Sequence, residues 1–333
     1  MLRFGAVGVG GFLEGTIAPA IAAEPDSELA AVVSRDPARA DTFAARWGVP
    51  NAYTSYEDML SSPEVDAVYI ATPNSLHADQ VVAAAGAGKH VFCEKPLANN
   101  AADAARASSA CETAGVRLGI DFHNRYVPWV RDVTAMIAAG DIGDVRVVEV
   151  DVGSGPRHYD NWRADPDVAG LGSVHNVGVH ALDFLGVLLD AMPLEVAAMF
   201  DPDPAEAAVE MLGMILIRFD NGVIAYLNCN ETLENPTNAI KLYGSRGRIV
   251  GSDFTRSRMG GDLSVVIGEE ESITHYPAAE AHRLCLAAFT AAVLDGRDPV
   301  PSGVDGLRSA QVCEAIALSV RERRIVTVDY GSI

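Results

Sequence analysis

The sequence predicts two domains: an α/β domain with a doubly wound parallel sheet, then an α+β domain with a large, mostly antiparallel open sheet. Up to Phe122, short apolar runs alternate with helix-compatible segments, which is typical of parallel strands joined by right-handed crossovers. After residue 210, long apolar runs are separated by turn signals instead. The 333 residues are enough for two cores. We therefore expect domains at residues 1–123 and 124–333.

The first domain is predicted to contain six strands with helices between them. Apolar runs predict strands at Leu2–Val9, Leu29–Val33, Ala52–Thr54, Asp66–Ala71, His90–Glu94 and Val116–Phe122. The segments between them predict helices at Phe12–Ala23, Pro37–Trp47, Tyr56–Leu60, Ser75–Ala85 and Ala101–Ala114.

A glycine turn follows the first predicted strand. Gly8 suits a tight turn, and Gly10 lets the backbone approach a pyrophosphate at the positive end of the next helix. The third glycine of this dinucleotide fingerprint would fall on Leu13, so the motif is incomplete, and we expect Gly11 to supply the missing clearance. Gly8, Gly10, Gly11 and Phe12 are thus candidate cofactor-binding residues.

The end of the second strand bears on which dinucleotide binds. Ser34 and Arg35 can bind a 2′-phosphate, with Arg39 one turn further along. Asp36 is the rival, because a carboxylate here binds the ribose 2′-hydroxyl of the unphosphorylated cofactor. We predict a preference for NADP(H), with NAD(H) as the alternative.

Lys95 ends the buried run His90–Cys93, and Pro96 prevents the strand from continuing. An ammonium is rarely placed beside a buried strand unless it is paired or used. Open α/β sheets bind ligands at the carboxyl ends of their strands, so Lys95 is the first catalytic candidate. The preceding strand end adds Thr72, Pro73, Asn74 and His77 as ligand candidates, although a turn and a structural histidine would explain them as well.

The second domain is predicted to be rich in strands. They are expected at Arg146–Gly153, Met211–Phe219, Val223–Asn230, Ala239–Tyr243, Arg248–Val250, Leu263–Ile267 and Ser272–His275, with helices at Val174–Leu189, Ala279–Leu294 and Val304–Arg323. One sheet face would carry apolar residues such as Met214, Leu216 and Tyr226. We therefore expect a homodimer or homotetramer formed through this sheet.

Three polar residues in the helix Val174–Leu189 share one helical face. Asn176, His180 and Asp183 stand at i, i+4 and i+7, so Asp183 is placed to orient the imidazole of His180. A polar stripe at a domain interface would give the same spacing. His175 lies off this face.

Composition excludes several classes of protein. The net charge of −20 argues against nucleic acid and anionic membranes as partners. No stretch approaches the roughly 20 apolar residues of a membrane span. The apolar N-terminal run is broken by glycines, which favours a strand and loop over a secretory signal. Five scattered cysteines without metal-ligand spacing indicate reduced thiols in a cytoplasmic protein with no metal site.

Together, Gly8-x-Gly10, Thr72-Pro73-Asn74-x-x-His77 and Glu94-Lys95-Pro96 resemble the glucose-fructose oxidoreductase, inositol dehydrogenase and rhizopine catabolism (Gfo/Idh/MocA) family. Within it, the Ser34-Arg35 tip is similar to NADP-dependent sugar oxidoreductases of the 1,5-anhydro-D-fructose reductase type. The resemblance implies a Rossmann domain and extends to the segments 123–126 and 161–170. It adds Glu94, Trp162 and Arg163 as cofactor residues, and Asn124, Arg125, Tyr159 and Trp162 as substrate residues.

The family pattern D-x-G-x-H appears here as Asn176-Val177-Gly178-Val179-His180, with asparagine in place of aspartate. The resemblance implies hydride transfer between NADP(H) and a sugar, keto-sugar or polyol. His180 would be the acid/base, Lys95 would polarise the substrate oxygen, and Asn176 would donate a hydrogen bond to it. Two alternatives stay open: a non-catalytic cofactor-binding regulator, which the change to Asn176 favours, and a glycosidase or lyase that uses NAD transiently.

Overall fold

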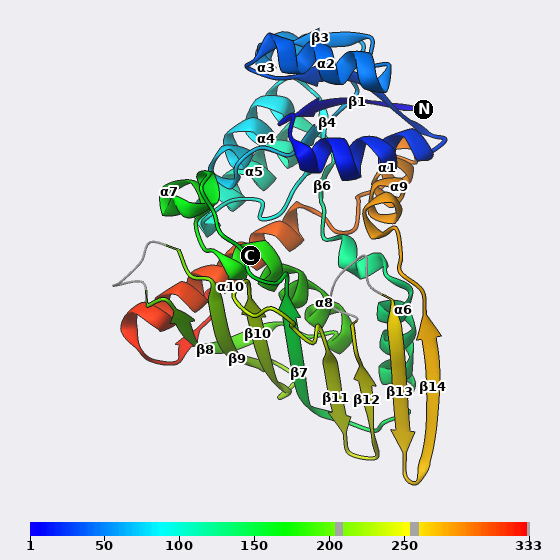
Figure 1. Cartoon of the computed structure of the whole chain (residues 1–333), viewed down its shortest axis with the longest axis vertical. Coiled ribbons are helices and arrows are strands. Elements are labelled where there is room, and N and C mark those ends of the chain that lie inside the picture. Colours follow the sequence, from blue (N-terminus) through cyan, green and yellow to red (C-terminus); the bar gives the residue numbers. More distant parts are fainter. Residues whose placement is uncertain (204–208, 254–259, 332–333) are drawn as a thin grey trace. The chain divides into compact units, whose positions relative to one another are not determined.

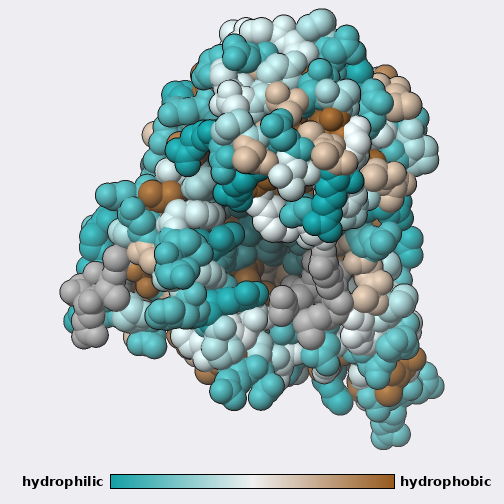
Figure 2. All heavy atoms as spheres, turned by 45° about the horizontal axis from the view of Figure 1, so that its top comes forward, coloured by the Kyte–Doolittle hydropathy of each residue, from teal (hydrophilic) through white to brown (hydrophobic). Residues whose placement is uncertain are grey.

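The computed structural model describes residues 1–203, 209–253 and 260–331. The chain divides into two compact units, Met1–Phe122 with His282–Ala310, and His123–Ala281 with Gln311–Ile333. The first break lies one residue from the expected boundary. The segment His282–Ala310, which the sequence placed in the second domain, belongs to the first unit. On the face drawn in Figure 2, hydrophilic side chains predominate and hydrophobic ones form small separate groups.

The first unit contains a six-stranded parallel sheet in the order β3-β2-β1-β4-β5-β6, with helices between the strands (Figure 1). The strands are β1 (Leu2–Val7), β2 (Ser27–Val33), β3 (Asn51–Tyr53), β4 (Ala67–Ile70), β5 (His90–Cys93) and β6 (Leu118–Ile120). The order reverses at β1 and β4, so the predicted doubly wound sheet is confirmed.

The connecting helices are α1 (Ala18–Ala23), α2 (Pro37–Trp47), α3 (Tyr56–Leu60), α4 (His77–Gly86) and α5 (Ala101–Ala114). Three of them, α2, α3 and α5, begin at a residue whose side chain caps them. In α5, for example, the Asn100 side chain accepts from Asp103 N at the start, and Gly115 takes a left-handed φ of 68° after the end.

Helix α9 (Ala281–Leu294) explains why the segment from His282 onward returns to the first unit. Its Phe289 ring stacks on Phe92 of β5, with centroids 4.8 Å apart. A Cβ added at Gly119 of β6 would lie 2.5 Å from the Phe289 ring, so this strand leaves room for the aromatic side chain. The buried hydroxyls of Thr290 and Ser27 are 2.9 Å apart.

The second unit contains a nine-stranded sheet in the order β14-β13-β12-β11-β7-β10-β9-β8-β15 (Figure 1). The strands are β7 (Val145–Gly153), β8 (Pro193–Asp201), β9 (Leu212–Phe219), β10 (Ile224–Asn230), β11 (Ile240–Gly244), β12 (Gly247–Gly251), β13 (Gly261–Ile267), β14 (Glu270–Tyr276) and β15 (Val326–Thr327). Only β7 and β10 pair in parallel within the described sheet. The predicted mostly antiparallel sheet is therefore confirmed.

Burial alternates along β9 as a sheet with one covered face requires. Ile215 and Ile217 are buried, whereas Met214 and Leu216 are 37% and 53% exposed. Strands β7 and β10 pack on the helical segment η5 (Val174–Gly178), which continues into α8 (Val179–Leu189). The other face is open, as predicted.

Several elements differ from the expectation. Residues 174–178 form a π-helical turn rather than α-helix, and so do residues 13–17 (η1, Leu13–Ile17). Helix α6 (Pro128–Ala139) and the strands β8 and β15 were not predicted. Helix α10 (Gly303–Glu322) matches its prediction. No helix among the described residues is both long and apolar enough to cross a membrane.

Candidate active site

The glycine loop after β1 has the space that a pyrophosphate needs. Gly8 has φ +100°, and a Cβ there would lie 2.4 Å from the carbonyl oxygen of Ala71, so only glycine fits. A Cβ at Gly11 would meet no atom within 4 Å, so the loop surface is open at this point. Val9, Gly10, Gly11 and Arg39 help to line a hollow of about 300 Å³. These residues fit a dinucleotide, although the buried Leu13 replaces the third glycine.

Polar side chains surround the end of β2. Asp36 Oδ1 accepts from Ala38 N at 3.0 Å and so caps α2. The hydroxyl of Ser34 accepts from Asp36 N at 3.2 Å, and Arg35 is exposed. Arg39 donates to the carbonyl oxygen of Val9 at 2.8 Å, which holds a guanidinium beside the glycine loop. The carboxylate is thus engaged by the helix, while the two cationic groups lie at the surface of this end of the sheet.

His77 ties the ends of β4 and β5 together. Its Nδ1 lies 2.7 Å from Pro96 O, and its Nε2 lies 2.8 Å from Thr72 O. The ring is buried, which lowers the pKa of His77 although the two carbonyls oppose that shift. His77 therefore has a structural role, fixing the two loops that carry Thr72 and Lys95. Pro73, Asn74 and Lys95 are half-buried at the same ends.

Glu94, next to Lys95, belongs to a buried polar network. The Tyr69 hydroxyl lies 2.6 Å from Glu94 Oε1 and 3.1 Å from Asp121 Oδ2. His282 Nδ1 lies 2.9 Å from Asp121 Oδ2, and its ring contacts that of Phe12, with centroids 5.4 Å apart. Burial, and then the neighbouring Asp121, raise the pKa of Glu94 to about 8. The residue next to Lys95 is thus held by the Tyr69 hydroxyl, which also contacts the second buried carboxyl, Asp121.

In the second unit, the helical segment η5–α8 carries Asn176 and His180. His180 is 8% exposed, and its ring centroid lies 4.5 Å from that of His123. Asp183 is bound by Arg125, whose Nε and Nη2 donate to its carboxylate at 2.7 and 2.6 Å. Arg125, which was predicted to contact substrate, thus forms a bidentate ion pair with Asp183. Asn124 beside it is buried.

Glu210 fixes the start of this helical segment. Its carboxylate accepts from Gly172 N at 2.7 Å and from Val174 N at 2.9 Å. Burial raises the pKa of Glu210 to about 7, while these amides lower it. His175, which is buried, accepts from Leu171 N at 3.1 Å and serves the same turn.

The loop of residues 154–163 contains residues predicted to contact substrate and is called the substrate loop below. It is anchored to Glu231 at the end of β10. Tyr159 and Ser154 donate to Glu231 Oε1 at 2.8 and 2.9 Å. Asn176 Nδ2 donates to Glu231 Oε2 at 3.0 Å and to the Tyr159 hydroxyl at 2.6 Å. Two of the predicted site residues, Tyr159 and Asn176, are therefore in direct contact.

The two remaining loop candidates contact each other. The guanidinium of Arg163 lies 4.3 Å from the Trp162 ring centroid, over its face. The Tyr159 ring lies 6.0 Å away on another side. Both Trp162 and Arg163 are half-buried, so the loop presents an aromatic and cationic surface.

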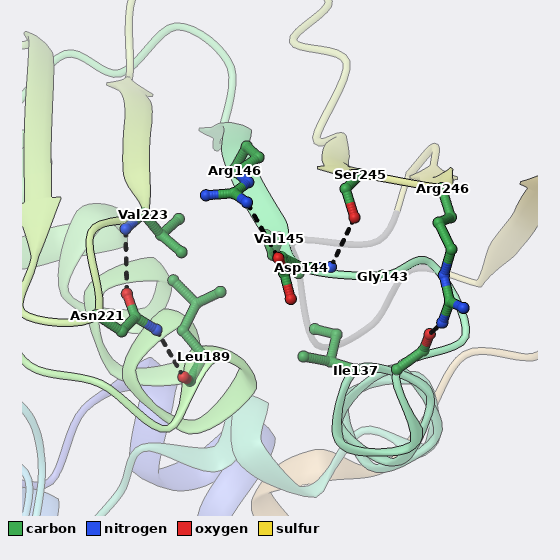
Figure 3. Close-up of a pocket in the computed structure, with 11 residues that line it drawn as sticks. Ile137, Gly143, Asp144, Val145, Arg146, Leu189, Asn221, Val223, Ser245 and Arg246 are labelled. Carbon is green, nitrogen blue, oxygen red and sulfur yellow. Dashed lines mark hydrogen bonds and ion pairs between the residues drawn. The ribbon is translucent and has the colours of Figure 1, made fainter.

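A second hollow of about 570 Å³ lies at the opposite end of β7 from Gly153 and has no predicted site residue in its lining (Figure 3). The polar groups that line it form hydrogen bonds with one another. Ser245 Oγ accepts from Asp144 N at 3.1 Å, and Asn221 donates to Leu189 O at 3.1 Å. Arg246 donates to Gly140 O. The hollow is therefore a structural feature of these turns.

The residues of these networks that sequence reasoning missed include Tyr69, Asp121, Ser154, Glu210, Glu231 and His282. Asp121 and Glu231 each stand at the end of an apolar run, which is the signal that identified Lys95. The same criterion, applied to carboxylates, would have found them. Tyr69 and His282 carry no such signal, because their roles depend on partners far away in the sequence.

Comparison with known proteins agrees with this architecture. Residues 2–122 match the Gfo/Idh/MocA oxidoreductase family with an NAD-binding Rossmann fold, and residues 130–250 match the Gfo/Idh/MocA C-terminal domain. The chain is 31% identical to 1,5-anhydro-D-fructose reductase of Ensifer adhaerens, over 99% of this chain and 100% of that protein. It is also 31% identical to D-xylose 1-dehydrogenase (NADP(+)) 2 of Haloferax volcanii, over 98% and 100%.

Among solved structures, the aldose-aldose oxidoreductase from Caulobacter crescentus, complexed with glycerol, superposes with a TM-score of 0.90. The two sequences are 29% identical, and the match covers 98% of this chain and 99% of the other. Both domains and nearly the full length are thus accounted for by one family. The chain belongs to the Gfo/Idh/MocA family of NAD(P)-dependent oxidoreductases.

Proposed function

We propose that this protein transfers a hydride between NADP(H) and a sugar, keto-sugar or related polyol. The observation that carries the proposal is its full-length similarity to two enzymes named for sugar substrates, the anhydrofructose reductase and the xylose dehydrogenase. The loop side chains Tyr159, Trp162 and Arg163 support it, because aromatic faces and hydrogen-bonding groups suit the recognition of sugar rings and hydroxyls.

The choice of NADP(H) rests on the end of β2. Asp36 Oδ1 is held by the amide of Ala38, while the hydroxyl of Ser34 and the exposed guanidinium of Arg35 suit a 2′-phosphate. The xylose dehydrogenase relative carries NADP(+) in its name.

We assign the cofactor to residues at the carboxyl edge of the first sheet, with Trp162 and Arg163 of the loop as further contacts. Those of the first unit are Gly8, Gly10, Gly11, Phe12, Ser34, Arg35, Arg39, Thr72, Pro73, Asn74, Glu94 and Lys95. His77 was predicted to contact the cofactor. We assign it instead a structural role in the two loops, because both its ring nitrogens face backbone carbonyls.

The bound nicotinamide supplies or accepts the hydride. In the oxidation direction, a carbinol C–H bond and its O–H bond break, and a C=O bond forms. His180 takes the hydroxyl proton, since an imidazole titrates near neutral pH. Lys95 stabilises the negative charge that develops on the same oxygen. In reduction, His180 returns the proton.

We further propose that two copies associate through the open face of the second sheet. Met199, Leu216 and Ile325 are 78%, 53% and 62% exposed there and help to line an apolar groove of about 740 Å³. A second copy is the proposed occupant, since the groove spans the neighbouring strands β8, β9 and β10, and an apolar sheet face of this kind suits an isologous contact. The five free, buried cysteines suit the reducing cytoplasm.

The proposed activity is tested by screening sugars and keto-sugars in both directions with NADP(H) and NAD(H), following nicotinamide absorbance. Turnover with a sugar and a preference for NADP(H) are expected. Cofactor binding without turnover of any sugar would point to a regulator. Retained cofactor with sugar cleavage and no net redox change would point to a glycosidase or lyase.

A further inference from the structure

Glu231 is a buried carboxylate on which three side-chain donors converge. It is 3% exposed, and it accepts from the hydroxyls of Ser154 and Tyr159 and from the amide of Asn176, at 2.8 to 3.0 Å. The backbone carbonyl of Glu231 also accepts from Arg157 N at 2.8 Å. An ionised carboxylate is stable in such a place only when hydrogen bonds replace its water. One residue thus joins β10, the substrate loop and the helical segment η5.

The hydrogen bonds of Asn176 define how its amide is used. Nδ2 carries two hydrogens, and its two acceptors are Glu231 Oε2 at 3.0 Å and the Tyr159 hydroxyl at 2.6 Å. The negative charge of Glu231 fixes which end of the amide faces it. Both N–H groups of Nδ2 therefore already donate hydrogen bonds. Any further hydrogen bond of this amide is one that its Oδ1 accepts. The expectation that Asn176 donates to the substrate oxygen is thus at odds with this geometry.

The residue types at positions 176 and 231 depend on each other. An aspartate at 176 would bring a second carboxylate to about the place of Nδ2, 3.0 Å from Glu231 Oε2, without a proton to donate. Two like charges at this distance in a buried site cannot both ionise readily. A glutamine at 231 facing an aspartate at 176 would restore one donor and one charge. The amide and the carboxylate therefore form a matched pair.

We propose that Glu231 is a positioning residue of the substrate site. Its charge holds Tyr159 and the substrate loop against η5 and fixes the amide of Asn176 as a hydrogen-bond acceptor. This inference rests on the proposed function, because the loop is taken to contact a sugar. It assigns no proton transfer to Glu231.

The test compares Glu231→Gln, Asn176→Asp and the double swap, in the full-length protein with saturating NADP(H) and the best sugar from the screen. The control Glu234→Gln removes an exposed carboxylate from the segment that follows β10, three residues after Glu231. Each single change should lower kcat/KM at least about tenfold, the range of one hydrogen bond to a charged group. The loss in Asn176→Asp should shrink below neutral pH, as the carboxyl pair takes up a proton. The double swap should recover most of the loss.

Two results would overturn the inference: a wild-type kcat/KM and pH profile for Glu231→Gln, or a double swap no better than the worse single variant. Thermal unfolding of the same proteins separates this inference from the proposed function. As pH rises, Asn176→Asp should lose thermal stability relative to the double swap, because its carboxyl pair loses the shared proton. This difference is expected even if no sugar is turned over, in which case the proposed function alone fails. A stability difference that does not change with pH would refute the matched pair.

Discussion

The hydroxyl of Tyr69 lies 2.6 Å from Glu94 Oε1 and 3.1 Å from Asp121 Oδ2. A phenol has a single proton to donate, so both contacts are hydrogen bonds only if one of the two carboxyls is protonated. His282 Nδ1 beside Asp121 favours an ionised Asp121. Glu94, whose pKa burial raises to about 8, is therefore the carboxyl that holds the proton at neutral pH.

This assignment predicts how stability depends on pH. The folded-state pKa of Glu94 exceeds its ordinary value of 4.5. Between those values the unfolded chain loses the proton while the folded chain keeps it, so the wild-type free energy of unfolding falls as pH rises. Glu94→Gln cannot titrate. Its stability relative to wild type should therefore increase from pH 5 to 8, by up to about 1.4 kcal/mol per pH unit.

Urea unfolding at several pH values measures this difference. Glu28→Gln, which removes an exposed carboxylate from β2, should follow the wild type throughout. A constant difference between Glu94→Gln and wild type would show that Glu94 is ionised in the folded protein.

Cofactor preference should respond to a charge at Ser34. Ser34→Asp places a carboxylate where the 2′-phosphate is expected, and it should lower the ratio of kcat/KM for NADPH over NADH at least about tenfold. Ser61→Asp adds the same charge at an exposed position after α3 and should leave the ratio unchanged. An unaltered ratio in Ser34→Asp would contradict the assigned phosphate site.

Leu216 tests the proposed dimer. Leu216→Lys puts a charge on the open face of β9, and light scattering coupled to gel filtration should then show a monomer. Ile273→Lys changes a residue of β14 that is 65% exposed but does not line the groove, and it should remain dimeric. A wild-type monomer, or a dimer that survives Leu216→Lys, would count against this interface.

His77 should contribute to stability. The neutral ring of His77 has one N–H, which donates to the carbonyl of either Pro96 or Thr72. His77→Ala leaves that carbonyl without its donor and removes the buried ring between the two loops, which should lower the free energy of unfolding by about 1–3 kcal/mol. His158→Ala, in an exposed part of the substrate loop, is the control. Equal unfolding curves for the two variants would assign His77 no structural role.

The first sheet was predictable because its strands are short apolar runs separated by helix-compatible segments. The sequence could not place α9 in the first unit, since that depends on Phe289 stacking on Phe92. It also missed β8, whose residues alternate too weakly between buried and exposed positions to stand out.

The site was predictable to the extent that a residue type is unusual in its position. Lys95 stood out at the end of a buried strand. Asp183 was placed correctly on its helix. Its ion pair with Arg125 was not predicted, because helical spacing cannot reveal a partner 58 residues away. Glu231 and Asp121 acquire their roles only from donors that the fold brings to them.

Lys95→Ala tests the central claim most directly. Turnover of the best sugar should fall below detection, because the developing charge on the substrate oxygen loses its cation, while His180→Ala should lose less. The dissociation constant for NADPH, measured by fluorescence, should change far less than turnover in Lys95→Ala, because the other assigned cofactor contacts remain. Near-normal turnover in Lys95→Ala would contradict the account.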